Sequence, residues 1–280
     1  MPIYEQTYRR YEARQPLRGV RFWPITREAL RLLLAKRVFL ALLALCWVPF
    51  LGFVIYVWAL TQFPEAGRMF PAGGAIFGRF FRFQIPLVLI LATFGGAGLI
   101  ASDLRTGGIL VYLSRPLTRR DYVVGKLGVL LALILFVTLV PALLLYAIAL
   151  GLAPKQFLQW NLVWVAPAVT AYALALALVV GLLALAVSSL SRSVRVAQFA
   201  FFGLIMGLEV FRGILSLVLN RPEAVLVSPQ GSLRIVGDAL FGLTSRNALP
   251  WPLPAVALVL LAVGCLAVLR ARVRAVEIVT

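Results

Sequence analysis

Side chains that commonly carry out chemistry are scarce in this sequence. Histidine is absent from its 280 residues, which excludes imidazole metal ligands and Ser-His or Cys-His nucleophile pairs. The two cysteines, Cys46 and Cys265, lie in separate apolar runs without a CxxC pattern, so neither a zinc site nor a disulfide is indicated. The sequence contains no GxxxxGK[ST] loop to hold nucleotide phosphates. We therefore expect no catalytic centre, no metal site and no cofactor bound by this chain.

The richest polar stretch is the loop 102–126, with the sequence SDLRTGGILVYLSRPLTRRDYVVGK. Gly107 and Gly108 permit a tight turn, the apolar ILVYL segment follows, and Pro116 breaks the chain again. Thr118 and Asp121 have the spacing of a capping box ahead of a long apolar run. These signals predict a turn, a short structured element, a break and a new helix, in that order. An apolar ILVYL segment in a polar loop needs a cover, either the membrane surface or a protein partner.

A second charged group, Glu209 and Arg212, lies inside an apolar run. The two residues are three positions apart and share one face of a helix. At 1.5 Å per residue they would lie about 21 and 26 Å from Arg195, across a hydrocarbon core of about 30 Å. Charge at that depth either forms a structural pair or belongs to a translocation path, and the sequence leaves both alternatives open.

The composition places these residues in a membrane protein. Apolar residues make up 62% of the chain and charged residues only 13%, a balance that a soluble domain could not bury in one core. A spanning helix needs about 20 mostly apolar residues, and six stretches qualify. They are 38–61, 84–101, 123–150, 160–187, 195–219 and 252–270. The predicted fold is therefore an all-α membrane protein with six transmembrane helices.

We divide the chain into a cytoplasmic arm, 1–37, and a six-span transmembrane domain, 38–280. In the arm, Thr26 stands at the N-cap position of a helix with Leu30, Leu33 and Leu34 on one face and basic residues on another. This pattern predicts an amphipathic helix lying in the membrane interface. The segment 220–250 is too apolar for a free loop.

Lysine and arginine set the expected orientation. The N-terminal arm, the 102–126 loop, the turn after the fourth span and the tail together hold 19 of the 27 basic residues. The side with more Lys and Arg faces the cytoplasm, so both termini are expected there. Trp58, Trp160, Trp164 and Trp251 fall near the other ends of their spans, where indole rings favour the interface. We assign the net charge of +17 to topology and anionic lipid contact, and expect no nucleic acid partner.

Prolines interrupt three of the predicted spans at Pro49, Pro141 and Pro167. Each removes a backbone donor and leaves a carbonyl that a neighbouring helix must satisfy. The resulting irregularities either adjust packing or allow a cavity to open and close. The glycines of FGGAGL, at 94–99, are expected to let helices approach closely.

The segment ASDLRTGGILVYLSRPLTRRDYVVGKL, six spans, inside termini and an amphipathic helix before the first span together resemble the membrane subunit of a type-2 ATP-binding cassette (ABC) exporter. In that family the loop after the second span contains a coupling helix that docks on a separate ATPase. The specific motif covers about residues 101–127. The resemblance assigns an ATPase-coupling role to the matching positions. These are Asp103, Arg105, Gly107, Leu113, Ser114, Arg115, Pro116, Arg119, Gly125 and Lys126.

The resemblance implies a permease that moves substrate across the membrane with energy from ATP. It also implies that the segment 220–250 forms short helices that re-enter the outer leaflet. ATP and Mg²⁺ would bind the partner ATPase subunit. A second permease subunit would complete a two-plus-two assembly, expected to be a homodimer in the cytoplasmic membrane of a bacterium or archaeon. The residues also leave room for a non-transporting anchor that recruits cytoplasmic partners, or an ion-coupled carrier. Glu209 is the only acidic residue clearly inside a predicted span, so the sequence favours neither an ion-coupled carrier nor an intramembrane enzyme. Substrate identity does not follow from the sequence.

Overall fold

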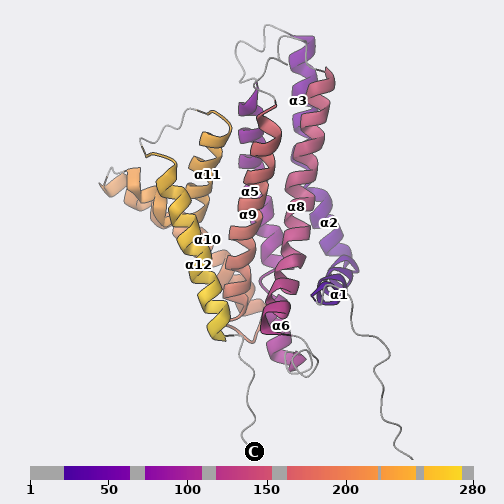
Figure 1. The fold of residues 1–280 in the computed structure, drawn as a ribbon, viewed down its shortest axis with the longest axis vertical. Coiled ribbons are helices and arrows are strands. Elements are labelled where there is room, and N and C mark those ends of the chain that lie inside the picture. Colours follow the sequence, from indigo (N-terminus) through magenta and orange to yellow (C-terminus); the bar gives the residue numbers. More distant parts are fainter. Residues whose placement is uncertain are drawn as a thin grey trace, which may run out of the picture.

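The long apolar runs form helices, and the computed structural model describes them over residues 22–63, 73–108, 118–152, 163–219, 222–243 and 249–272. Every regular element in these ranges is helical, and Figure 1 shows most of them standing side by side along the long axis. The helices are α1 (Trp23–Leu34), α2 (Arg37–Leu45), α3 (Val48–Gln62), α5 (Gly74–Gly95), α6 (Leu99–Thr106), α8 (Arg119–Leu152), α9 (Val165–Ser188), α10 (Val194–Leu219), the 3-10 helix η1 (Pro222–Val227), α11 (Pro229–Leu240) and α12 (Pro252–Arg272).

Six stretches in the described ranges are long and apolar enough to cross a membrane, which confirms the predicted fold class. They comprise α2 with α3, α5 with α6, and the single helices α8, α9, α10 and α12. The predicted boundaries agree within a few residues except at the second span. That helix begins at Gly74, ten residues before the predicted start at 84, because the FGRFFRF sequence remains helical despite its two arginines. Arg79 and Arg82 therefore lie inside the helix.

The enclosed centre of the bundle is formed mainly by α9. This helix contacts α8, α10 and α12 and has the largest buried share of the six spans. Its many alanines, with Gly181, allow close approach, since a Cβ at Gly181 would lie 3.1 Å from Leu127. In contrast, α10 has the smallest buried share. The bundle thus leaves α10 with an extensive apolar surface for lipid or another protein.

Two irregular spans share one buried amide, that of Gln84 on α5. Its Nε2 donates to the Val137 carbonyl at 2.6 Å, which has lost its helical donor because Pro141 has no N–H. The same nitrogen donates at 2.9 Å to the carbonyl of Cys46, where α2 ends and the chain turns into α3. A neighbouring helix therefore satisfies the carbonyl freed by proline, as expected. Both cysteines are buried and free.

Of the other two prolines predicted to interrupt spans, Pro49 lies directly after the break that divides the first span into α2 and α3, whereas Pro167 does not interrupt its helix. Pro49 occupies the first turn of α3, and Pro167 lies near the start of α9. In the first turn a backbone N–H has no helical acceptor, so proline is tolerated there. Pro86 instead lies inside a helix, because α5 begins earlier than predicted.

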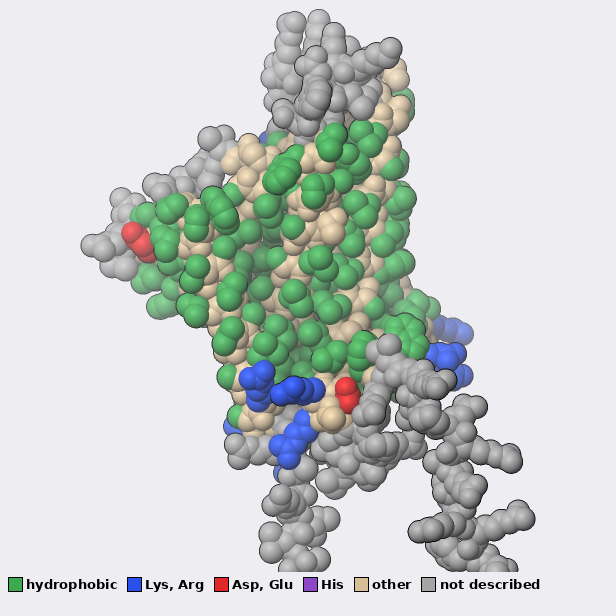
Figure 2. All heavy atoms as spheres, in the orientation of Figure 1, with side chains coloured by type: hydrophobic (Ala, Val, Ile, Leu, Met, Phe, Trp, Pro, Cys, Tyr) green, Lys and Arg blue, Asp and Glu red, His purple; other side chains and the backbone are tan. Residues whose placement is uncertain are grey.

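Basic side chains gather at one end of the bundle, the lower end in Figure 2. We call this the basic end. It holds α1, α6, the starts of α8 and α10, and the end of α12 (Figure 1). The surface between the two ends is largely apolar in the view of Figure 2. Short helices were predicted for 220–250, and η1 and α11 lie within that segment.

Candidate functional site

Helix α6, at the basic end, carries the first residues of the predicted coupling loop. The chain turns between α5 and α6 at Gly96 to Gly98, where side chains would collide: a Cβ at Gly96 would lie 2.5 Å from Leu130, and one at Gly98 would lie 2.7 Å from Val194. These close approaches confirm the packing role expected for the glycine-rich FGGAGL segment. At its other end α6 stops at Gly107, whose φ of +70° is the left-handed conformation that glycine adopts without strain.

The first turn of α6 is capped from another helix. The buried hydroxyl oxygen of Ser188, the last residue of α9, accepts hydrogen bonds from the backbone N–H groups of Ile100 at 3.0 Å and Ala101 at 3.1 Å. A helix leaves its first N–H groups without internal partners, and a buried unpaired donor destabilises the fold. Ser188 thus fixes α6 to the central helix. Sequence reasoning missed it, because the only signal was a small polar residue ending an apolar run.

A buried ion pair joins α6 to α8. The Lys126 ammonium lies 2.8 Å from the Asp103 carboxylate, with side-chain exposures of 5% and 16%. The Tyr122 hydroxyl donates to the same carboxylate at 2.8 Å, and the Lys126 ammonium lies 5.7 Å from the centre of the Tyr122 ring. Two buried charges are stable only when paired and hydrogen-bonded. Asp103 and Lys126, 23 positions apart, therefore connect α6 to α8. We call this contact between the two helices the α6–α8 joint.

The start of α8 has the predicted capping box. The Asp121 N–H donates to the Thr118 hydroxyl at 3.2 Å, and the Asp121 carboxylate accepts from the Thr118 N–H at 3.0 Å and from its hydroxyl at 2.8 Å. These bonds satisfy backbone donors that the first turn would otherwise leave open. Both ends of the segment between α6 and α8 are therefore fixed in geometry.

Helix α1 packs onto α8 through glycines. A Cβ at Gly125 would lie 3.0 Å from Ile25, and a Cβ at Gly128 would lie 3.0 Å from the Thr26 hydroxyl. That hydroxyl donates to the Gly125 carbonyl at 2.8 Å. The glycines therefore form the surface on which the amphipathic helix rests.

The predicted start of this amphipathic helix was wrong. Helix α1 begins at Trp23, with proline in its first turn, and Thr26 is buried inside the helix instead of capping it. Of the three leucines predicted to share one face, Leu33 is buried, Leu30 is partly buried and Leu34 is exposed. A hydrogen bond to a distant carbonyl overrode the local capping signal of Thr26.

The predicted coupling residues have different placements. Asp103 and Lys126 pair, Gly107 ends α6, and Gly125 receives α1. Arg105 and Arg119 are exposed at the basic end. Leu113, Ser114, Arg115 and Pro116 lie outside the described residues.

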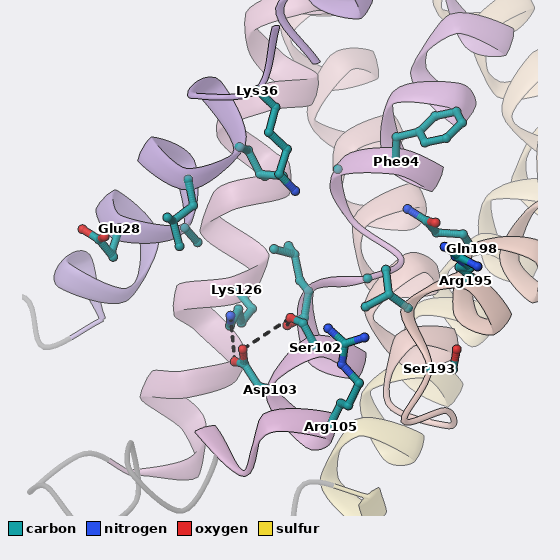
Figure 3. A pocket seen from close by; sticks show the side chains of 17 residues that line it. Glu28, Lys36, Phe94, Ser102, Asp103, Arg105, Lys126, Ser193, Arg195 and Gln198 are labelled. Atoms are coloured by element: carbon teal, nitrogen blue, oxygen red, sulfur yellow. Dashed lines mark hydrogen bonds and ion pairs between the residues drawn. The ribbon is translucent and has the colours of Figure 1, made fainter. Parts of the chain in front are cut away.

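A groove of about 750 Å³ opens beside the Asp103–Lys126 pair. Figure 3 shows side chains from α1, α6 and α10 around it, with the ion pair at its edge. Its wall includes apolar residues such as Leu32 and Phe94 as well as charged ones. The joint between α6 and α8 therefore borders a space large enough for a small ligand.

At the opposite end, Glu209 and Arg212 of α10 form the predicted pair. Their side chains meet at 2.6 Å. The second Glu209 oxygen accepts from the Ser228 hydroxyl at 2.6 Å, and Ser228 caps α11 by accepting from the Gly231 N–H at 3.2 Å. The pair therefore has a structural contact, anchoring the start of α11 to α10.

A second ion pair at that end was not predicted. The Arg82 guanidinium on α5 lies 2.5 Å from the Asp238 carboxylate on α11. The two residues are 156 positions apart, and Arg82 lies outside the predicted second span, 84–101, so the sequence offered no spacing signal. Helix α11 is thus attached by charged contacts to both α5 and α10.

Comparison with known proteins agrees with this arrangement. Residues 59–272 match the family described as ABC-2 family transporter protein, whereas no curated protein matches the chain. The match begins in the first span and ends with α12. It thus contains the break between α5 and α6, the Asp103–Lys126 joint, the Arg82–Asp238 pair and the Glu209–Arg212 pair. The chain belongs to the ABC-2 transporter family and is an integral, multi-pass membrane component of an ABC transporter.

Proposed function

We propose that this chain is the permease subunit of an exporter driven by a separate ATPase that docks at the basic end. The observation that carries the proposal is the joint between α6 and α8, where the buried Asp103–Lys126 pair ties two spans together. A docked partner that moves this joint would move α5 and α8 with it. A slack loop could not transmit such a displacement.

In the proposed cycle, ATP binding closes a pair of ATPase subunits, and each subunit holds the segment between α6 and α8 of one permease. The closed ATPase pair favours the arrangement of spans compatible with its own spacing, which is a shift between two states through differential contacts. ATP and Mg²⁺ stay on the partner. Two permease chains, expected to be identical, would form the substrate path between them.

The proposed orientation places the basic end in the cytoplasm. It rests on the excess of Lys and Arg at this end. Trp58, Trp164 and Trp251 lie toward the opposite end of their helices and are exposed, as expected for side chains in an interface. The ATPase is then on the side where ATP is available, in the cytoplasmic membrane of a bacterium or archaeon.

The test is isolation of the tagged chain from its native membrane, with Arg115→Ala and Pro116→Ala as coupling variants. We expect an ATPase subunit to co-purify with the native chain and its amount to fall about tenfold with each variant, the effect of losing about 1.4 kcal/mol of binding. Arg234→Gln, an exposed arginine of α11 at the opposite end, is the control and should retain the partner. Absence of any ATPase, or equal loss in the control, would contradict the proposal.

A further inference from the structure

The groove beside the Asp103–Lys126 joint has an uneven charge distribution. Asp103 is already paired with Lys126, and Glu28 on α1 is the other carboxylate in its lining. Against Glu28 stand three further cations, Lys36, Arg105 and Arg195, all exposed. The groove therefore has excess positive charge, and Figure 3 shows the three cations around it.

The three cations occupy equivalent positions in three spans. Lys36 immediately precedes α2, Arg105 lies in the last turn of α6, and Arg195 lies in the first turn of α10. Each therefore lies where an apolar helix ends, the depth at which lipid headgroups are found. Ser193 and Val194 bring the N-terminus of α10 to the groove, and the partial positive charge of a helix N-terminus adds to the field.

Apolar surface leads from this charged rim toward the middle of the spans. Leu32 and Phe94 line the groove, and both are more than half exposed. Next to the lining residues, Val38 is 84% exposed and Phe199 is 78% exposed. These side chains continue along α2 and α10 away from the cations. A ligand for this site would have an anionic head and an apolar tail.

We propose that this groove binds an anionic membrane lipid, with its phosphate among Lys36, Arg105 and Arg195 and its acyl chains along Phe94 and the exposed faces of α2 and α10. Basic pockets between spanning helices are sites for anionic headgroups, and the groove volume lies in the range of small-molecule sites. The exposed apolar side chains in and beside the groove favour a lipid over a free phosphate or an acidic peptide, neither of which would cover them. The bound lipid would contact the α6–α8 joint directly.

The experiment measures lipid binding to the purified, delipidated full chain by native mass spectrometry. The probes are dioleoylphosphatidylglycerol, which is anionic, and dioleoylphosphatidylcholine, which is zwitterionic. For the Lys36→Gln/Arg195→Gln variant we expect affinity for phosphatidylglycerol to fall by about one order of magnitude or more, given the contribution of each basic residue near an anionic surface. Affinity for phosphatidylcholine should change little.

The matched control is Arg31→Gln/Arg192→Gln. It removes the same charge from α1 and from the loop before α10, but neither residue lines the groove. It should bind phosphatidylglycerol within about twofold of the native chain, since neither side chain lines the groove. Equal loss in both variants would show a diffuse charge effect, and no loss in either would show that the groove is not the site. Either result would overturn the proposal.

Two further arms separate the alternatives. Glycerol phosphate, which has the headgroup anion without acyl chains, should not displace the lipid; displacement would show that the groove recognises a free phosphate. A groove variant that binds lipid normally but no longer retains an ATPase would show a protein-docking surface instead. Lipid binding is measured without the partner, so failure of the proposed export function would leave this inference standing, and the reverse also holds.

Discussion

Two short helices at opposite ends of the bundle, α6 and α11, are held by the same kinds of contact in different surroundings. Each begins at a serine cap, Ser188 for α6 and Ser228 for α11, and each carries an aspartate paired with a cation from another helix. The cation of α6, Lys126, is 5% exposed, whereas the cation of α11, Arg82, is 39% exposed. The two aspartates are similarly enclosed, at 16% exposure for Asp103 and 12% for Asp238. The difference therefore lies in how far water reaches the cation, which weakens the charge interaction of Arg82 relative to that of Lys126.

The strongest way to break the comparison is Lys126→Met. It leaves the Asp103 carboxylate at a buried joint without its cation, and loss of one partner of a buried pair costs about 3–5 kcal/mol. We expect the free energy of unfolding, measured by denaturant titration in bicelles, to fall by that amount. The double variant Asp103→Leu/Lys126→Met should recover most of it. A single variant as stable as the native chain would show that the pair does not fix α6.

Removing either serine cap should lower the free energy of unfolding by less than Lys126→Met does, and the two caps should differ from each other. Ser188→Ala leaves two buried N–H groups of α6 without acceptors, and we expect a loss of about 1–3 kcal/mol in the free energy of unfolding. Ser228→Ala removes one cap bond and one bond to Glu209, and its capping loss should be about 1 kcal/mol. Hydrogen exchange should rise at Ile100 and Ala101 in the first variant and at Gly231 in the second. Equal protection at α6 in native and Ser188→Ala protein would refute the capping role.

The smallest effect is expected for Arg82→Gln. Asp238 is enclosed, at 12% exposure, but Arg82 is 39% exposed, so water can partly take the place of the guanidinium. We expect the free energy of unfolding to fall by about 1 kcal/mol or less. Loss of the pair should let α11 move more freely relative to α5. Spin labels on the two helices should then report a broader distance distribution than in the native chain. Arg79→Gln, one turn away on the same helix, is the control, and a matching broadening there would remove the assigned role of the Arg82–Asp238 pair.

The sequence was sufficient for the features that depend on composition and local spacing. Six apolar runs gave six spans, Thr118 and Asp121 gave a capping box, and Glu209 with Arg212 gave a pair one turn apart. In the capping box and the charge pair, the interacting residues are three positions apart in the chain. The spans depend only on the preference of long apolar runs for the membrane. The family followed from the loop after the second span.

The remaining features depend on partners far apart in the chain. The hydroxyl of Thr26 has a capping spacing, yet it donates to Gly125, 99 positions away. Nothing near Ser188 marks it as the acceptor for α6, and nothing near Arg82 marks Asp238. Such contacts are decided by how the helices pack, which local pattern does not encode. The groove between α1, α6 and α10 is a product of the same packing.

The amide of Gln84 links the break between α2 and α3 to the proline-containing turn of α8. One nitrogen serves the carbonyl freed by Pro141 in α8 and the carbonyl at the end of α2. Substitution of Pro141 by leucine would restore a helical donor and leave the amide with a single acceptor, while loss of the amide would strand both carbonyls in a region without water. Homologous chains should therefore exchange these residues together, and a chain with the proline but an apolar residue at position 84 should need a substitute donor from another helix.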